Sequence, residues 1–162
     1  MAVDMFVQLD KIQGETSDSA IKGGIDIISF SWGMTQTGTM HSGAGGGAGK
    51  AAVQDLTVIK YIDKTTPVVM KMCLAGTHIE KATLLVRKAG GKTPVTYMKI
   101  IMEKVLISGV QTAGAEKEER ITETLTFNFA KVKVEYTPQK EDGSAAAAVL
   151  MGWDIAANKE IG

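Results

Sequence analysis

Apolar and polar side chains alternate along much of this chain, which is the pattern of β-strands whose two faces meet different surroundings. The alternation is clean over residues 25–37. One face of this predicted strand carries large apolar side chains, at Ile28, Phe30, Trp32 and Met34. The other face carries small or hydroxyl-bearing residues, at Ser29, Ser31, Gly33, Thr35 and Thr37. We therefore expect the first face to pack in a core and the second to look away from it.

A second long strand is predicted over residues 121–136, with a change of pattern in its middle. Its first half places Leu125, Phe127 and Phe129 on one face, opposite three threonines and Asn128. Its second half shifts the apolar side chains by one position, to Val132, Val134 and Tyr136. Such a shift predicts either a bulge near Ala130 or a strand that leaves one sheet for another.

The remaining alternation predicts several more strands and therefore a mainly β protein. These strands are expected at 2–9, 53–62, 82–88, 94–111 and 149–155. One helix is predicted, beginning at Thr66 and Pro67 and closed by Gly76, with Val69, Met72 and Cys73 as its apolar stripe. Many strands with one short helix predict a β-barrel or sandwich with the helix at its side.

Composition limits what this fold can do. The 162 residues fit a single domain, 1–162, and 18 basic residues balance 18 acidic ones. A net charge of zero disfavours nucleic acid as a partner and leaves association of copies unopposed by self-repulsion. The longest apolar run, 145–151, is too short to insert into a membrane, and the N-terminus has no basic region typical of a secretory signal.

A glycine-rich segment at 38–50 invites a phosphate-binding interpretation, which the residues do not support. A P-loop needs glycine at the position of Ala44 and a hydroxyl at the position of Ala51, after Lys50. The segment also leads into a strand pattern rather than into a helix whose N-terminus would hold an anion. We expect a surface loop.

Catalytic and metal-binding patterns are equally weak. The serine motif at 29–33 lacks its first glycine and lies within a strand pattern. Cys73 could pair with His78, but its place on the apolar helical stripe favours a buried structural thiol. With one cysteine and two scattered histidines, we expect no metal site, no cofactor and no enzyme.

Six stretches of the sequence resemble the haemolysin-coregulated protein (Hcp) family, the tube subunits of bacterial type VI secretion systems. They are MAVDMF at 1–6, SWGMTQTGTMHSGAGGGAGK at 31–50, VQDLTVIKYIDKTTP at 53–67, RKAGG at 87–91, ERITETLTFNFAKVKVEYTPQKEDG at 119–143 and GWDI at 152–155. The resemblance runs from end to end in one register.

This resemblance implies a β-barrel of two packed sheets with one lateral α-helix, assembled into a homo-hexameric ring. Rings of the family stack on copies of themselves, inside a contractile sheath and behind a spike, and secreted effectors ride in the ring lumen. No catalysis is implied. The protein would act in the cytoplasm within the assembled tube and would then be secreted without a signal peptide.

The resemblance also assigns residues. Ser31 matches a lumen-facing position, and Ser29 and Thr35 should share its face by alternation. The glycine-rich segment matches an extended loop that reaches towards neighbouring subunits or rings. Its candidate contact residues are His41, Gly45, Gly46, Gly47 and Lys50.

Two other functions fit the pattern of residues. A phage or tailocin tail-tube subunit has a related fold, and neighbouring genes would distinguish it. A monomeric β-barrel that binds a small ligand would instead contain an apolar cavity and would remain a monomer in solution.

Overall fold

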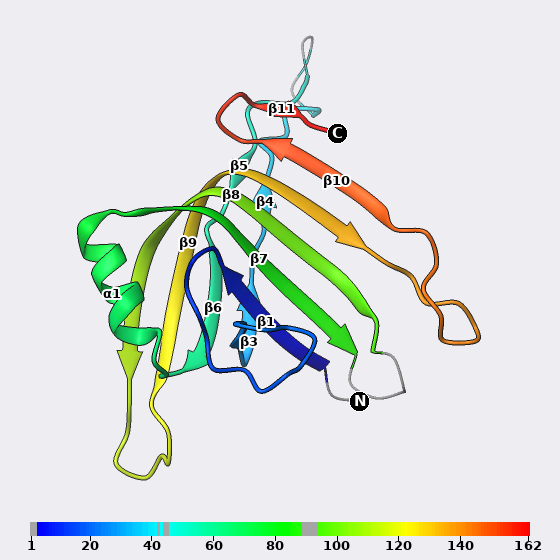
Figure 1. Ribbon diagram of the computed structural model, residues 1–162. Coiled ribbons are helices and arrows are strands. Elements are labelled where there is room, and N and C mark those ends of the chain that lie inside the picture. The colour runs from blue at the N-terminus through cyan, green and yellow to red at the C-terminus, as the bar shows by residue number, and fades with distance from the viewer. Residues whose placement is uncertain (1–2, 42, 44–45, 89–93) are drawn as a thin grey trace.

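The computed structural model describes residues 3–41, 43, 46–88 and 94–162. This described part of the chain is mainly β with one short helix, as predicted (Figure 1). In chain order the elements are β1 (Val3–Leu9), β2 (Ile25–Asp26), β3 (Ser29–Ser31), β4 (Met34–Thr35), β5 (Ala52–Val53), β6 (Leu56–Tyr61), α1 (Thr66–Ala75), β7 (His78–Lys88), β8 (Thr96–Ala113), β9 (Thr122–Tyr136), β10 (Val149–Asp154) and β11 (Lys159–Glu160).

The prediction of one strand over residues 25–37 was wrong, because the structure divides this segment into three. β2 pairs with β1, and the chain then crosses to β6, with which β3 pairs. The crossing is visible in two backbone bonds: Ile27 N donates to the Met5 carbonyl, and Ile28 N donates to the Ile59 carbonyl. A second break follows β3, since the register against the partner strand shifts by one residue between β3–β6 and β4–β5.

Two long antiparallel strands, β8 and β9, organise the sheet around them (Figure 1). On one side of β9, residues 122–127 pair with β6 and residues 131–136 pair with β10. The change of apolar pattern near Ala130 therefore coincides with a change of neighbouring strand. The prediction of a bulge there or of a move to another sheet was wrong, because β6, β9 and β10 belong to one sheet and the β8–β9 register is regular around Ala130. The register irregularity lies instead in β8, between Ile107 and Gly109.

A sharp local conformation accompanies this change of neighbours. Lys104 in β8 has a φ of 55°, in the left-handed region that non-glycine residues rarely adopt. On either side of it the buried positions of β8 change phase, from Ile100 and Met102 to Val105 and Ile107. The irregular backbone at Lys104 therefore keeps the apolar side chains of β8 in the core both before and after this residue.

The core fills the space between these strands and α1. Its largest members include Phe127, Leu56, Leu84, Ile100, Met102 and Leu125. The predicted helical stripe is confirmed, because Val69 is fully buried and Met72 and Cys73 pack against the core. The predicted end is also confirmed, with Gly76 in the left-handed conformation at φ 64°.

The start of α1 differs from the prediction. Thr65, not Thr66, occupies the N-cap position, and its side chain makes no capping bond there. The Thr65 hydroxyl instead donates to Asp63, and the Thr66 hydroxyl accepts from the Asp63 backbone N–H at 3.1 Å. The turn before the helix thereby satisfies these hydroxyls locally.

Candidate functional site

The most extended candidate surface is one face of the strands β3, β6, β9 and β8, which follow one another in that order. Cross-strand pairs align Ser31 with Thr57, Thr57 with Thr126, and Thr126 with Gly109. The next row aligns Ser29, Ile59, Thr124 and Gln111. We call these eight residues, with Asn128, the polar face. They include no charged side chain, and their strand neighbours Val58, Leu125 and Phe127 are buried in the core behind them.

A hydrogen-bonded cluster fixes one end of the polar face. The Asp55 carboxylate accepts a bond from the Ser108 hydroxyl at 2.7 Å and one from the Asn128 side-chain amide at 2.8 Å. The Ser108 hydroxyl also lies 3.1 Å from the Thr126 hydroxyl. The carboxylate is thus satisfied by the protein itself, which leaves hydroxyl and amide groups as the chemistry that the face offers.

Sequence reasoning missed this cluster for a physical reason. Its residues are separated by 53 and 73 positions along the chain, so no local spacing brings them together. Only the registers of β6–β9 and β8–β9 place Asp55, Ser108 and Asn128 side by side. The threonine and asparagine positions of β9 did signal a polar face, but not its partners.

The three residues expected on a lumen-facing strand do not lie in one sheet. Ser29, half-buried, and Ser31, exposed, share the polar face on β3. Thr35 is exposed but belongs to β4, in a separate two-stranded sheet with β5. The structure therefore brings Ser29 and Ser31 together with Thr57 and leaves Thr35 apart from them.

The face opposite these residues packs only in part. Phe30 and Trp32 contact the core, with the Trp32 ring 6.2 Å from that of Phe129 and its indole N–H donating to the Gln54 carbonyl at 2.9 Å. The prediction was wrong for Ile28 and Met34, which are 42% and 50% exposed. Ile28 lies between β2 and β3, where the chain changes its partner strand, and Met34 begins the separate two-stranded sheet of β4 and β5.

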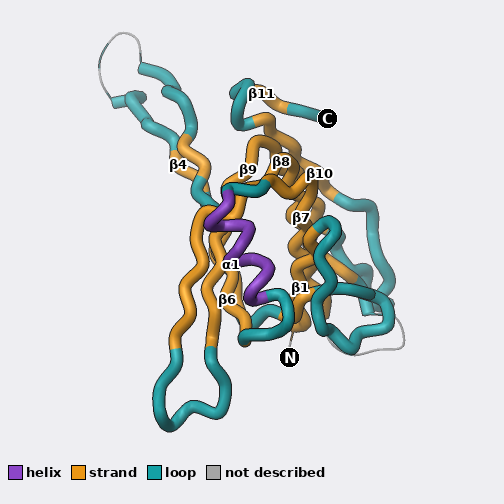
Figure 2. The backbone as a smooth tube through the Cα atoms, turned by 60° about the vertical axis from the view of Figure 1, so that its left-hand side comes forward, coloured by secondary structure: helices purple, strands orange, loops and turns teal. Residues whose placement is uncertain are grey.

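The described residues of the glycine-rich segment form part of a projecting β-ribbon, which we call the arm, residues 34–41, 43 and 46–53. Figure 2 shows the arm, with β4 at its base, extending away from the body of the molecule. Backbone contacts hold its two sides together, including a bridge between Gly38 and Ala48. The Thr39 hydroxyl donates to the Gly47 carbonyl at 2.8 Å and accepts from the Gly47 N–H at 3.0 Å.

The candidate contact residues of the arm are mostly exposed. His41, Gly46 and Lys50 are exposed, Gly47 is half-buried, and Gly45 lies outside the described residues. A side chain at Gly46 would bring its Cβ within 2.9 Å of the Thr39 carbonyl, so glycine is required there by the close approach of the two sides. After Lys50 the chain enters β5, so no helix N-terminus follows the glycines.

The residues weighed for chemistry do not assemble a reactive centre. Cys73 packs against the core from α1, and His78 is exposed at the start of β7. Among the described residues, no three histidine, cysteine or acidic side chains gather as metal ligands.

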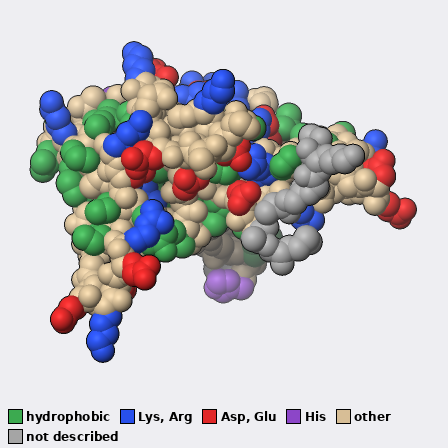
Figure 3. All heavy atoms as spheres, turned by 60° about the horizontal axis from the view of Figure 1, so that its bottom comes forward, with side chains coloured by type: hydrophobic (Ala, Val, Ile, Leu, Met, Phe, Trp, Pro, Cys, Tyr) green, Lys and Arg blue, Asp and Glu red, His purple; other side chains and the backbone are tan. Residues whose placement is uncertain are grey.

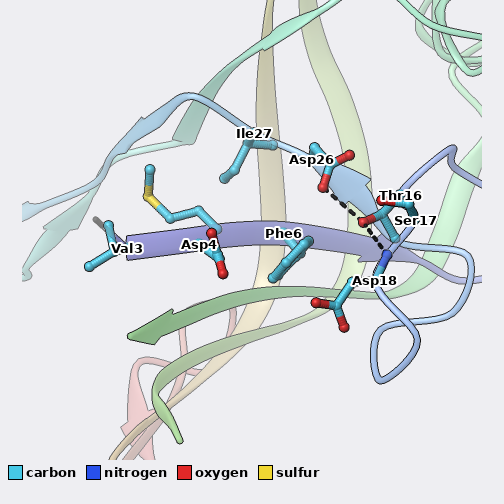
Figure 4. Close-up of a pocket in the computed structure, with 9 residues that line it drawn as sticks. Val3, Asp4, Phe6, Thr16, Ser17, Asp18, Asp26 and Ile27 are labelled. Atoms are coloured by element: carbon cyan, nitrogen blue, oxygen red, sulfur yellow. Dashed lines mark hydrogen bonds between the residues drawn. The ribbon is translucent and has the colours of Figure 1, made fainter. Parts of the chain in front are cut away.

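A small pocket of about 300 Å³ lies where β1, β2 and the loop before β2 meet (Figure 4). Its acidic groups already have partners, since Arg87 pairs with Asp18 and with Asp4, and the Thr16 hydroxyl donates to Asp26. The hydrogen bond from Arg87 lowers the pKa of Asp18 below its ordinary value. These ion pairs and hydrogen bonds hold the loop before β2 against the sheet, so the carboxylates of the pocket have a structural role.

Comparison with known proteins gives one consistent result. Residues 6–136 match the family described as "Type VI secretion system effector, Hcp". The chain is 49% identical over 159 residues to the Pseudomonas aeruginosa protein named hcp1, covering 98% of each chain.

Solved structures agree with the sequence match. A structure described as a type six secretion system protein has a TM-score of 0.92 at 29% identity, covering 99% of this chain and 100% of its own. Hcp1 from Salmonella typhimurium has a TM-score of 0.82 at 35% identity, covering 99% of this chain and 100% of its own.

No helix in the described part of the protein is long and apolar enough to cross a membrane. The chain belongs to the Hcp family, the non-enzymatic tube proteins of type VI secretion systems.

Proposed function

We propose that six copies of this chain close into a ring whose channel is lined by the polar face, and that such rings stack into the secreted tube. The carrier role for effectors is the one that the family implies. The match to the type VI family over residues 6–136 favours this function over a phage tail tube or a monomeric ligand-binding barrel.

The observation that carries the ring is a pair of open strand edges flanking the polar face. Within the described residues, β3 pairs only with β6, and β8 beyond Leu106 pairs only with β9. Open edges of this kind are normally covered. When β3 of one copy meets β8 of the next, the sheet continues from copy to copy, and a repeated rotation closes a ring.

Closure of each subunit into a barrel is part of the same proposal. The segment from Ile25 to Ser31 is bonded to β1 at its start and to β6 at its end. It thus links the two ends of the strand path β6–β9–β8–β7–β1. A closed subunit of this kind is stiff enough to hold the polar face in a fixed curvature.

The polar face suits a channel that carries varied cargo. Its hydroxyl and amide groups can both donate and accept hydrogen bonds, and they impose no charge on what passes. Ser29 and Ser31 lie at one edge of this surface, and Thr35, on the arm, lies beyond it. We therefore assign effector contact to Ser29, Ser31, Thr57 and Thr126, with Thr35 nearer to the subunit boundary.

Export tests the function directly. An epitope-tagged chain should appear in the medium of a bacterium whose type VI sheath is intact and should stay in the cells when the sheath gene is deleted. A tagged cytosolic enzyme serves as the control for lysis. Equal release from the two strains would contradict a role in a contractile tube, and the sheath and spike would then not be its partners.

A further inference from the structure

A small pocket lined by three lysines lies beside β1 and β7, on the side of these strands that faces away from the core. Its volume is about 300 Å³. Gln8 and Thr83, which are paired across the two strands, line it and are half-buried, whereas their strand neighbours Val7, Leu9 and Leu84 are buried in the core. We call it the lysine pocket. It is separate from the polar face, with which it shares no residue.

The lining of the lysine pocket is basic. Lys11 follows β1, Lys22 lies in the loop before β2, Lys81 belongs to β7, and all three are exposed. Asp10 is the one carboxylate among the lining residues. Within the described part of the chain, no ion pair joins any of the three lysines to an acidic residue. The lining therefore carries two positive charges in excess, and its ammonium groups are available to a ligand.

This local excess differs from the surface elsewhere. Figure 3, which shows one face of the molecule, has Lys and Arg side chains interleaved with Asp and Glu. The whole chain balances 18 basic residues against 18 acidic ones. A concave site lined by one sign of charge concentrates the electrostatic field more than a mixed surface does. The lysine pocket should therefore attract an anion although the chain as a whole has no net charge.

Two similar turns position two of the lysines. Residues 9–12 and 21–24 each form a turn closed by a backbone hydrogen bond from the fourth residue to the first, of 3.1 and 3.0 Å. The third residue of the second turn is Gly23, with a φ of 74°, and Lys22 precedes it. The third residue of the first turn is Lys11, with a φ of 64°. Glycine adopts this conformation without steric cost, whereas lysine does not. A lysine held in a strained conformation at a pocket points to a functional need for its side chain.

Further contacts bring the three lysine-bearing segments together. Asp10 N donates to the Lys81 carbonyl at 3.0 Å, and Gly14 N donates to the Gly23 carbonyl at 2.9 Å. The Gln13 side chain lies against Gly23, since a Cβ there would come within 2.4 Å of its Oε1 atom. The backbone thus fixes the positions from which the lysine side chains reach the pocket.

The chemistry of the lining favours a phosphate group as the ligand. Lysine ammonium groups bind phosphate oxygens as point charges. Two excess positive charges match a phosphate monoester, which carries about −1.5 to −2 at pH 7. The amides of Gln8 and Gln13 and the Thr83 hydroxyl can bond to hydroxyl groups on the rest of the ligand. The volume lies at the lower end of the range of roughly 300–1,000 Å³ typical of ligand pockets, which suits a phosphorylated monosaccharide.

We propose that the lysine pocket binds the phosphate group of a sugar phosphate, with Lys11, Lys22 and Lys81 on its oxygens. This binding site lies outside the proposed channel and goes beyond the proposed tube function. Two sources offer the same chemistry. One is a free sugar phosphate, and the other is the phosphorylated sugar headgroup of a glycolipid at a membrane surface.

Isothermal titration calorimetry with glucose 6-phosphate tests the site in the intact chain. We expect saturable binding that glucose does not reproduce. Lys22→Gln and Lys81→Gln should each weaken it at least about tenfold, the effect of losing one hydrogen bond to a charged group. Lys11→Gly should weaken binding similarly while keeping or raising the melting temperature, because glycine relieves the strain. Lys71→Gln, at an exposed position of α1, is the matched control and should leave binding unchanged.

Two further measurements locate the site and identify the source of the ligand. Glucose 6-phosphate should slow chemical acetylation of Lys11, Lys22 and Lys81, but not of Lys71, as read by mass spectrometry. Sedimentation with phosphatidylcholine vesicles that contain lipid A, and not with phosphatidylcholine alone, would identify a glycolipid. Binding of glucose 6-phosphate without binding to these vesicles would identify a free ligand. Absence of both kinds of binding, or an equal loss in Lys71→Gln, would overturn the inference.

Discussion

The buried ion pair between Lys60 and Glu123 offers a sharp test of how the body of this protein is held together. The two residues are paired across β6 and β9, and both side chains are fully buried, with Nζ 3.1 Å from Oε1. Lys60 has two further partners, the Asp63 carboxylate and the Tyr61 carbonyl, each at 3.1 Å. Among the described residues, Lys60 is the only basic group within ion-pair distance of Glu123.

Because Lys60 has more partners than Glu123, replacing one of the two residues should lower the free energy of unfolding more than replacing the other. Lys60→Met removes the only compensation of the Glu123 carboxylate and should destabilise the fold by about 3–5 kcal/mol. Glu123→Leu leaves Lys60 with Asp63 and the Tyr61 carbonyl, so a smaller cost of about 1.5–3 kcal/mol is expected, that of one hydrogen bond to a charged group. The double variant should be more stable than Lys60→Met alone, because a buried pair replaced by apolar side chains is often neutral.

Urea unfolding followed by tryptophan fluorescence measures these free energies, at one fixed protein concentration because assembly also stabilises the fold. The matched control is Lys64→Met, an exposed lysine four positions away, which should change stability by less than about 0.5 kcal/mol. If the two single costs add in the double variant, or if Glu123→Leu costs more than Lys60→Met, the reasoning about shared partners is refuted.

Three further predictions address the polar face, the C-terminal strands and acid stability. Ser31→Gln should keep fold and ring but weaken retention of a lumen effector in a pull-down. Trp32→Ala should lower unfolding free energy by about 2–4 kcal/mol, at the low end for a core aromatic because the side chain is only half-buried; the opposite pattern would invert the face assignment. Gly152→Ala should lower the melting temperature, because its Cβ would lie 2.5 Å from the backbone carbonyl of Ile161, and an unchanged melting temperature would contradict that contact. The hydrogen bond from Arg87 lowers the pKa of Asp18 below 3.8, so its stabilisation is present above that pH and is lost as the pH falls through the folded value. Asp18→Asn should therefore lose less stability than the parent between pH 5 and about pH 2, and parallel urea midpoints across that range would count against the interaction.

Local pattern was sufficient to predict β9 and the helix. The alternation in β9 and the stripe of Val69, Met72 and Cys73 each follow from burial on one face. Gly76 ends α1 because the backbone needs φ 64° there, a requirement that local sequence can express. For these elements, residues close together in the sequence determine the secondary structure.

The features that sequence pattern did not predict depend on contacts with other parts of the fold. Residues 25–37 divide because the start of this segment pairs with β1 and its middle pairs with β6. No residue within the segment indicates this change of partner strand. Thr65 and Thr66 bond to Asp63 rather than capping α1, a choice made by the preceding turn. The Asp55 cluster forms only once β6, β8 and β9 are in register.

The central claim is that this chain is a ring-forming tube subunit. Native mass spectrometry at micromolar concentration tests it most directly, since the 17.2 kDa chain gives a distinct mass for each oligomer. We predict one dominant species at six times the chain mass, with larger species only as whole multiples of that ring. A dominant monomer across the concentration range would contradict both the ring and the channel lined by the polar face.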